Sequence, residues 1–272
     1  MTNWNKIIFE YICPSIGILI STALYTAPVK SLVIALERKS LGTLNPTPWG
    51  IMTGNCLGWL AYAYYSHDQF VLASNIPGIL ISFWLNTGAS KLQYYAQVEE
   101  TNEADNASEN GTTTWAVFTS QDKLLLGVLS FWAAVLVGVG WLEIANGREK
   151  EIVGIFVNIN LLFFYGAPLQ TIKIVIDEKC SDSIHNLTML LNCTNAGFWG
   201  AYGIAMDNIV IYGPNGIGLF LGFSQVILCC IFPKSSDRTS PGGVDHAPLL
   251  DASEDDSNTD EAIAVVPVSQ VI

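Results

Sequence analysis

Charged side chains are scarce in this chain, and long stretches of it carry none. Only 13% of its 272 residues are Asp, Glu, Lys or Arg, whereas a soluble domain has about a quarter. Hydrophobic residues make up 50% of the chain, and the mean hydropathy is +0.38. This composition excludes a soluble globular fold. It indicates an all-α integral membrane protein, because lipid requires each backbone group to hydrogen-bond within its own segment.

Basic residues and paired cysteines are also lacking. Twelve Lys and Arg stand against 24 Asp and Glu, for a net charge of −12, and no basic patch of the kind that binds nucleic acid occurs. None of the six cysteines forms a CxxC pair, so they are expected to be small hydrophobes in a membrane core. No nucleic acid, metal or cofactor is expected as a partner, and the chain is not expected to be an enzyme.

What is present is a set of apolar stretches of membrane-spanning length, which is roughly 17–25 residues. Seven occur, at about 7–33, 48–65, 70–92, 124–142, 152–175, 187–206 and 209–232.

The chain repeats itself at an offset of 140 residues, without a gap from 27–83 to 167–223. "APVKSLVIALERKS" (27–40) falls on "APLQTIKIVIDEKC" (167–180), and "SNIPGILISF" falls on "PNGIGLFLGF". The identical pairs include Trp59 with Trp199, Asn55 with Asn195, Tyr62 with Tyr202, and Asn75 with Asn215. Shared hydrophobicity does not place rare Trp and Asn residues in one register, so we interpret the pattern as a duplication.

Each copy holds three spans, and the unpaired span 124–142 lies between them. A three-span unit that enters on one side leaves on the other, so one further crossing restores the orientation for the second copy. The sequence therefore predicts seven transmembrane helices in a 3+1+3 arrangement of two parallel repeats joined by an inversion linker helix. The expected units are a first repeat at 1–95, an acidic cytosolic loop at 96–123, a linker helix and outer loop at 124–149, a second repeat at 150–233, and a disordered acidic cytosolic tail at 234–272.

Much of the acidic excess lies in two polar segments, 98–110 and 251–262, which we expect to be disordered. In the tail, "DHAPLL" (245–250) fits an acidic dileucine pattern, with Leu249 and Leu250 as the pair. It predicts a sorting adaptor as a partner, against the alternative of a solvated tail without a sorting role.

Basic residues at the span ends favour an outside N-terminus and a cytosolic C-terminus. This orientation places only Lys6, Arg148 and Lys150 outside. On the inside it places Lys30, Arg38, Lys39, Lys91, Lys123, Lys173, Lys179, Lys234 and Arg238. Two glycosylation sequons, at 106–108 and 110–112, fall in a loop that this orientation makes cytosolic. The plasma membrane is the favoured location, with an endosomal or vacuolar membrane as the alternative.

Three features of each repeat form one motif: Ala-Pro late in the first span, Asn with Trp four residues later in the second, and Asn with Gly three residues later in the third. With these residues, the chain over about 7–232 resembles the SWEET (MtN3/saliva) sugar transporter family. The resemblance implies a facilitative, bidirectional sugar carrier that works by alternating access, with possible homo-oligomers.

The resemblance also implies roles for residues of this chain. Asn75 and Asn215 match a pair that hydrogen-bonds the sugar, and Trp59 and Trp199 match aromatic positions that cover the sugar ring. Asn55 and Asn195 match pocket-lining positions, and the positions that gauge substrate size are matched by Ser21, Leu24, Leu161 and Phe164. The bulk of Phe164 favours a monosaccharide.

Gating and hinge roles follow in the same way. Tyr62 and Tyr202 match outer-gate tyrosines, and Asn208, beside Asp207, falls where the family often has a gating Asp. The prolines expected to act as hinges are Pro28, Pro168, Pro46 and Pro48. His67 and His185 are expected to be solvated loop residues.

Elementary chemistry supports the same site. Asn offers both a donor and an acceptor to a hydroxyl-rich ring, and Asn55 and Trp59 share one helix face because they are four residues apart. No ionisable residue lies near mid-depth of a span, although ion-coupled carriers place them there; this favours uniport. Two alternatives stay open: a related seven-helix carrier for another small solute such as an amino acid, and a seven-helix receptor.

Overall fold

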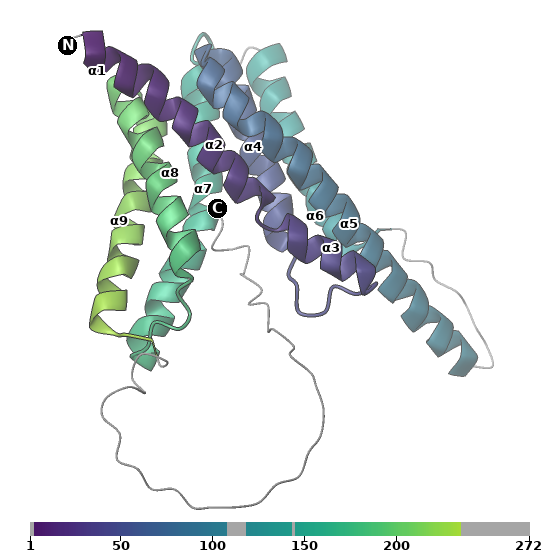
Figure 1. Cartoon of the computed structure of the whole chain (residues 1–272). Helices are drawn as coiled ribbons and strands as arrows, with labels where there is room; N and C mark the ends of the chain where they lie inside the picture. The colour runs from purple at the N-terminus through teal and green to yellow at the C-terminus, as the bar shows by residue number, and fades with distance from the viewer. Residues whose placement is uncertain (1–2, 108–117, 143–144, 235–272) are drawn as a thin grey trace, which may run out of the picture.

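The structure, a computed structural model, describes residues 3–107, 118–142 and 145–234, and this part of the chain is entirely helical apart from its connections. The elements are α1 (Asn3–Ile7), the π-helix η1 (Ile8–Ile12), α2 (Cys13–Thr26), α3 (Val29–Glu37), α4 (Thr47–Ser66), α5 (Gln69–Ala107), α6 (Ser120–Leu136), the π-helix η2 (Val137–Trp141), α7 (Glu149–Glu178), α8 (Asn186–Ala205) and α9 (Ile209–Ile231). Because α1 to α3 form one path and α6 runs into η2, seven rods result (Figure 1).

Five of these rods are long and apolar enough to cross a membrane by length and composition. They are Trp4–Glu37, Gln69–Glu100, Ser120–Trp141, Glu149–Glu178 and Ile209–Ile231. The other two, α4 and α8, have 20 residues each and carry Asn, Thr and several Gly. They can be less apolar because other helices flank them: α4 packs on α5, α6 and α7, and α8 packs on α9 and α2.

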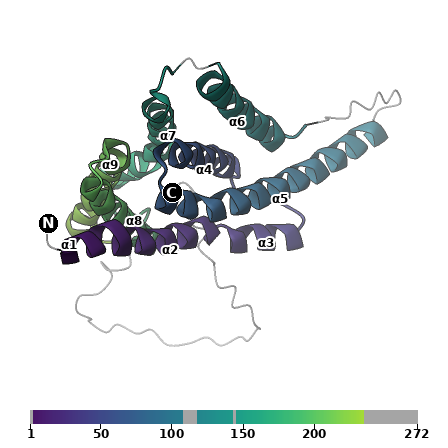
Figure 2. The ribbon, with the colours of Figure 1, turned by 90° about the horizontal axis from the view of Figure 1, so that it is seen from above.

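The two repeats meet through equivalent contacts. The first is built from α1–α3, α4 and α5, and the second from α7, α8 and α9. Within each repeat the third helix packs between the first and the second, and the repeats join where α2 meets α8 and where α7 meets α4. Seen from above, six rods form a closed arrangement and α6 lies outside it (Figure 2). The predicted 3+1+3 architecture is confirmed.

The linker helix α6 is fixed to the first repeat by a buried polar cluster. The Asn86 amide donates to the carbonyl of Trp49 and to the hydroxyl of Thr53, and its oxygen accepts from Gln121 at the start of α6. Gln121 also donates to the Pro46 carbonyl at 3.0 Å. The second-repeat residue equivalent to Asn86 is Val226, which has no polar side-chain atom to make the same bond.

Helix α5 is longer than the sequence predicted. It continues to Ala107, so the expectation of disorder at 98–110, and of a loop beginning at residue 96, is wrong over 96–107. The physical reason is composition: between Gly88 and Gly111 the sequence holds neither Gly nor Pro and is rich in Glu, Gln and Ala, which favour helix. Residues 108–117 and 235–272, including the dileucine pattern, lie outside the described residues.

The prolines lie at unequal places in the two repeats. Pro28 precedes α3, where the first-span helix is interrupted between Thr26 and Val29. Its counterpart Pro168 lies inside the continuous helix α7. Pro46 is the residue before α4 and Pro48 lies in its first turn, where a missing N–H costs nothing.

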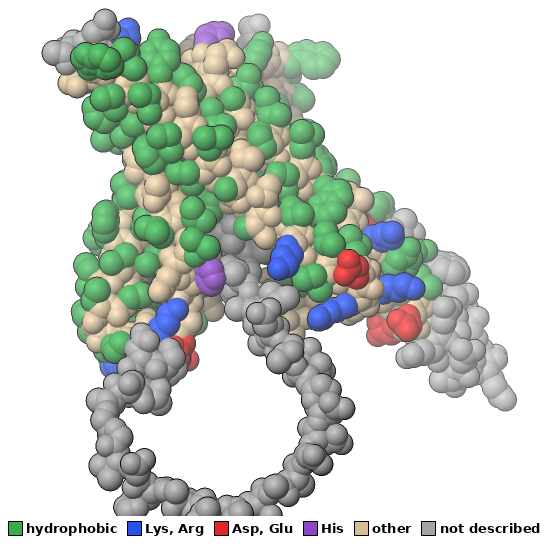
Figure 3. Space-filling model, in the orientation of Figure 1, with side chains coloured by type: hydrophobic (Ala, Val, Ile, Leu, Met, Phe, Trp, Pro, Cys, Tyr) green, Lys and Arg blue, Asp and Glu red, His purple; other side chains and the backbone are tan. Residues whose placement is uncertain are grey.

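The bundle has two ends that differ in packing. We call the end with residue 3 and the connections 67–68, 145–148 and 206–208 the N-terminal end; α9 finishes at the other, the C-terminal end (Figure 1). Near the N-terminal end one hydrophobic core joins both repeats, including Tyr62, Val71, Trp199, Tyr202 and Ile211. A second core, which includes Leu32, Trp49 and Leu85, belongs to the first repeat alone. Charged side chains on the face shown in Figure 3 lie mainly toward the C-terminal end.

Candidate functional site

A cavity of about 210 Å³ lies between the two repeats. On the same measure a single water needs roughly 10–15 Å³, so the cavity has room for a small organic ligand. Every first-repeat residue that lines it is matched by its second-repeat counterpart. The pairs are Ser21/Leu161, Leu24/Phe164, Tyr25/Tyr165, Asn55/Asn195, Trp59/Trp199, Val71/Ile211, Ser74/Pro214 and Asn75/Asn215. We call this pseudo-symmetric part of the cavity the chamber. All ten residues that the sequence predicted for substrate binding line it.

The paired asparagines of the third helices hold the same local conformation. Asn75 Nδ2 donates to the Val71 carbonyl at 2.9 Å, and Asn215 Nδ2 donates to the Ile211 carbonyl at 2.7 Å. A carbonyl only accepts, so these bonds fix which amide atom is nitrogen. The Asn75 oxygen also accepts from the Tyr25 hydroxyl at 3.4 Å. Each amide nitrogen is thereby bound to its own helix, and each amide oxygen points away from that carbonyl.

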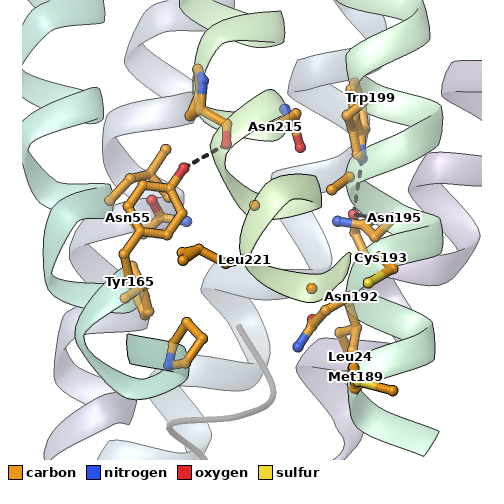
Figure 4. Close-up of a pocket in the computed structure, with 18 of the residues that line it drawn as sticks. Leu24, Asn55, Tyr165, Met189, Asn192, Cys193, Asn195, Trp199, Asn215 and Leu221 are labelled. Carbon is orange, nitrogen blue, oxygen red and sulfur yellow. Dashed lines mark hydrogen bonds between the residues drawn. The ribbon is translucent and has the colours of Figure 1, made fainter. Parts of the chain in front are cut away.

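One Asn–Trp pair, on the second helix of the second repeat, is held in place by a serine of the first repeat. Ser21 Oγ donates to Asn195 Oδ1 at 2.9 Å and accepts from the Trp199 indole N–H at 3.2 Å. The hydroxyl joins α2 of the first repeat to α8 of the second, so it fixes the amide and the indole together. In Figure 4, Asn195 and Trp199 lie on one side of the chamber, opposite Asn55 and Tyr165.

The equivalent Asn–Trp pair in the first repeat has no such partner. The residue in the place of Ser21 is Leu161, which has no polar atom. Asn55 is only 4% exposed, and its Oδ1 is buried without a hydrogen-bond partner in the part of the chain that the structure describes. A buried unpaired amide costs about 1–3 kcal/mol. Such a group, in a cavity wall, is available for a ligand hydroxyl.

Both tryptophans are supported by a tyrosine one turn later. Trp59 packs edge-on to Tyr62 with ring centroids 5.7 Å apart, and Trp199 packs edge-on to Tyr202 at 5.8 Å. Edge-to-face pairs of this kind are favourable. Each indole is therefore held by the tyrosine that closes the N-terminal end of the bundle.

Two hydrogen bonds between the repeats close that end. Tyr62 donates to Asn208 Oδ1 at 2.9 Å, and Tyr202 donates to Asp68 Oδ2 at 2.8 Å. Tyr62 and Tyr202 are equivalent in the repeat, and so are Asp68 and Asn208. Asp207, which the sequence analysis placed beside this gate, is exposed at a positive φ of 48° and makes neither bond.

The sequence analysis did not assign Asp68 a role. The signal was available, since the offset of 140 residues that pairs the tyrosines also pairs Asp68 with Asn208. The family resemblance pointed to a gating Asp only after the sixth span, at Asn208. This chain carries the acidic residue after the second span, at Asp68.

Toward the C-terminal end the cavity continues past the chamber, along the second repeat. His185 lines it there, where its Nδ1 accepts from the backbone N–H of Thr188 and caps α8. His185 lies in the connection before α8, as expected, but its ring is half-buried and caps the helix instead of being fully solvated. Gln225 also lines this part. Nothing in the repeat motif pointed to Gln225, because its first-repeat counterpart is Leu85.

Tyr165, a chamber residue that the sequence analysis also missed, ties α7 to α9. Its hydroxyl donates to the Pro214 carbonyl at 2.6 Å. Its counterpart Tyr25 instead bonds the side chain of Asn75. Among the described residues, no group of three or more His, Cys, Asp and Glu could hold a metal ion.

Comparison with known proteins gives one consistent relationship. The family model described as "Sugar efflux transporter for intercellular exchange" matches residues 13–86 and 151–237. The chain is 26% identical over 231 residues to the bidirectional sugar transporter SWEET8 of Arabidopsis thaliana, covering 84% of this chain and 90% of that protein. It is 21% identical to the sugar transporter SWEET1 of Dictyostelium discoideum, covering 85% and 96%.

The fold is matched by a solved structure. A eukaryotic SWEET transporter, determined at 3.7 Å, superposes with a TM-score of 0.61 at 20% identity, over 83% of this chain and 97% of that one. The matched family residues fall on the two repeats and leave out α6, as a duplicated unit around a linker requires. The chain belongs to the SWEET (MtN3/saliva) family of sugar transporters.

Proposed function

We propose that the protein is a facilitative, bidirectional uniporter for a small neutral sugar, with a monosaccharide bound in the chamber. The observation that carries the proposal is the chamber itself, a cavity between two like repeats lined by opposed amides and indoles. Amides supply donors and acceptors for hydroxyl groups. The flat indole faces suit the C–H side of a sugar ring. None of the residues that line the cavity carries a fixed charge, as suits a neutral ligand.

The mechanism we propose is alternating access by rocking of the two repeats. The structure represents a state closed at the N-terminal end, where the Tyr62–Asn208 and Tyr202–Asp68 bonds join the repeats. Breaking these bonds while the repeats approach each other at the C-terminal end would expose the chamber on the opposite side. The interruption before Pro28 and the proline within α7 are the positions at which we expect the helices to bend.

We further propose an outside N-terminus and a cytosolic C-terminus, because the positive charges gather at the C-terminal end. In this orientation the end closed by the Tyr62 and Tyr202 bonds is the outer one. The division into two repeats and a linker remains part of the proposal, with the third helix of the first repeat extended to Ala107, and so does a cytosolic position for the acidic segments. So do residence in the plasma membrane, association into homo-oligomers and recognition of Leu249 and Leu250 by a sorting adaptor.

The test is flux of labelled glucose into proteoliposomes that contain the purified protein. Asn75→Ala and Asn215→Ala each remove an amide from the chamber and are expected to abolish flux without loss of incorporated protein. Asn5→Ala, an exposed position outside the cavity, is the matched control and should transport normally. Normal flux in both chamber variants would defeat the assignment. No flux in the unaltered protein, with flux of an amino acid instead, would favour the other small-solute carrier.

A further inference from the structure

The cavity is larger on one side than its pseudo-symmetry requires. Beyond the chamber it extends toward the C-terminal end along α8 and α9, where it is lined by residues such as Met189, Cys193, Gly222 and Gln225. The first-repeat counterparts of these residues do not line the cavity. We call this one-sided part the extension.

The first repeat is filled at the equivalent place. Trp49 stands where the second repeat has Met189, and Leu85 stands where it has Gln225; both are 0% exposed in the first-repeat core. One pair of equivalent glycines, Gly78 and Gly218, shows the same difference, whereas Gly222 lies close to Cys193. A Cβ on Gly78 would lie 2.6 Å from Cys56 Sγ, whereas on its counterpart Gly218 the nearest atom, Ala196 Cβ, would be 3.7 Å away. The extension therefore exists because the second repeat carries smaller or more flexible side chains.

Gln225 gives the extension a polar centre. Its side chain lines the cavity and is only 8% exposed. A side-chain amide on a cavity wall can both donate to and accept from a ligand hydroxyl. Leu85, in the filled core of the first repeat, has no polar side-chain atom. At this position the second repeat therefore offers a donor and an acceptor group, where Leu85 of the first repeat offers only carbon.

Two polar levels are separated along α9. Asn215 in the chamber and Gln225 in the extension are ten residues apart, about 15 Å at the rise of an α-helix. The cavity-lining residues of α9 between them are Gly218, Leu221 and Gly222, which have no polar side-chain atoms. On the facing helix α8, Asn192 also lines the cavity, between Asn195 and Met189 (Figure 4). A single small ring bonded to Asn215 does not extend over the distance to Gln225.

We propose that the extension is a second binding subsite, centred on Gln225, that takes a hydroxylated neutral ring, namely a second molecule of the transported sugar. This inference rests on the proposed function, because it takes the ligand chemistry from the chamber. The sugar binds at the chamber between both repeats and, separately, at the extension within the second repeat alone. The subsite lies on the route between the chamber and the C-terminal end.

Native residues report on the two levels separately. Trp59 and Trp199 lie in the chamber, so their fluorescence reports sugar bound there. Cys193 lines the extension and is a free thiol, so its rate of alkylation, followed by mass spectrometry of its peptide, reports sugar bound there. Both signals are measured against glucose concentration on the purified full-length protein in detergent. We expect two different half-saturating concentrations.

The variants separate the two levels. Gln225→Leu copies the first repeat and should raise the glucose concentration that half-protects Cys193 by about tenfold or more, the effect of losing a hydrogen bond to a buried amide, while the tryptophan signal keeps its midpoint. Asn215→Ala should raise the midpoint of the tryptophan signal and leave the protection of Cys193 unchanged. Ser224→Ala, whose hydroxyl bonds the Phe220 carbonyl and does not line the cavity, should change neither midpoint.

Two outcomes would overturn the proposal of a second subsite, and a third would overturn the proposed sugar site as well. If both signals share one midpoint and both disappear in Asn215→Ala, the cavity holds one sugar and the extension is only a passage. If Gln225→Leu leaves the protection of Cys193 unchanged, the amide is not its ligand. If the unaltered protein shows no tryptophan signal with glucose, the proposed sugar site fails as well.

Discussion

Tyr202 of the second repeat donates a 2.8 Å hydrogen bond to the Asp68 carboxylate of the first. The other carboxylate oxygen accepts from the backbone N–H groups of Phe70 and Val71, which fixes its position at the start of α5. The pseudo-symmetric bond, from Tyr62 to Asn208, has a neutral acceptor. Bonds to charged groups are worth about 1.5–3 kcal/mol and neutral ones about 0.5–1.5 kcal/mol, so the Asp68 bond holds this end closed more strongly.

The first prediction concerns this gate. Tyr202→Phe should raise the population that is open at the N-terminal end by about tenfold or more, and Tyr62→Phe by less. The measurement is the reaction of Val71→Cys, a chamber position that is 2% exposed, with an impermeant thiol reagent applied to the N-terminal side. Tyr64→Phe, at the same end but 71% exposed, is the control. Equal reactivity in Tyr202→Phe and Tyr64→Phe would show that the bond does not hold the gate.

The second prediction concerns the serine that joins Asn195 to Trp199. Ser21→Ala leaves the indole N–H without its acceptor, so glucose affinity should fall by about tenfold. Because Ser21 and Asn195 act as one unit, Ser21→Ala combined with Asn195→Ala should be little worse than either alone. The measurement is a double-mutant cycle on the binding constant, from the tryptophan signal.

A neighbouring hydroxyl provides the control for that cycle. Thr22 bonds the carbonyl of Ile18 in its own helix and does not line the cavity. Thr22→Ala should leave affinity unchanged and should add nothing to Asn195→Ala beyond its own effect. Strict additivity of Ser21→Ala and Asn195→Ala would mean that the bond across the repeats does not position the site.

The third prediction separates stability from binding at two buried asparagines. Asn55 has an unpaired oxygen in the cavity wall, so Asn55→Leu should leave the fold as stable or stabilise it by about 1 kcal/mol. Asn86 donates to the Trp49 and Ser82 carbonyls and to Thr53, so Asn86→Leu should cost about 3 kcal/mol or more.

Thermal unfolding of the purified protein measures both effects, and glucose binding gives the second reading. Asn55→Leu should lose affinity for glucose although it stays stable. A site that binds hydroxyl groups needs a polar side chain that is unpaired without ligand, and such a side chain lowers stability. Asn86→Leu should bind normally at temperatures where it is folded. A strongly destabilised Asn55→Leu would indicate that the Asn55 amide is a structural group.

The duplication explains why so much of this site could be predicted. Rare residues in one register identify equivalent positions, and a two-fold arrangement of repeats brings equivalent positions to a common centre. Asn75 with Asn215 and Trp59 with Trp199 could therefore be identified as equivalent pairs from the sequence, and the family resemblance implied their place in one pocket. The same reasoning gave the seven helices and the linker.

What the sequence did not predict are the places where the repeats differ. Ser21 and Leu161 are equivalent in position, yet only the structure shows that Ser21 contacts the opposite repeat. Whether Met189 leaves a cavity that Trp49 fills depends on three-dimensional packing, which no pattern of hydrophobic residues specifies. The length of α5 was missed because acidic composition was taken as disorder, although helix propensity and the lack of Gly and Pro favoured helix.

The fourth prediction uses this asymmetry at two equivalent glycines. Gly78→Ala would place a Cβ 2.6 Å from Cys56 Sγ and 2.8 Å from the Tyr25 ring, and overpacking of this kind costs about 1–3 kcal/mol. Gly218→Ala meets only ordinary contact at 3.7 Å, and an Ala in a helix is about 1 kcal/mol more favourable than a Gly. The two substitutions should therefore shift the unfolding temperature in opposite directions. Equal shifts would mean that the second repeat is packed as tightly as the first, and then the extension would be too small to hold a second sugar.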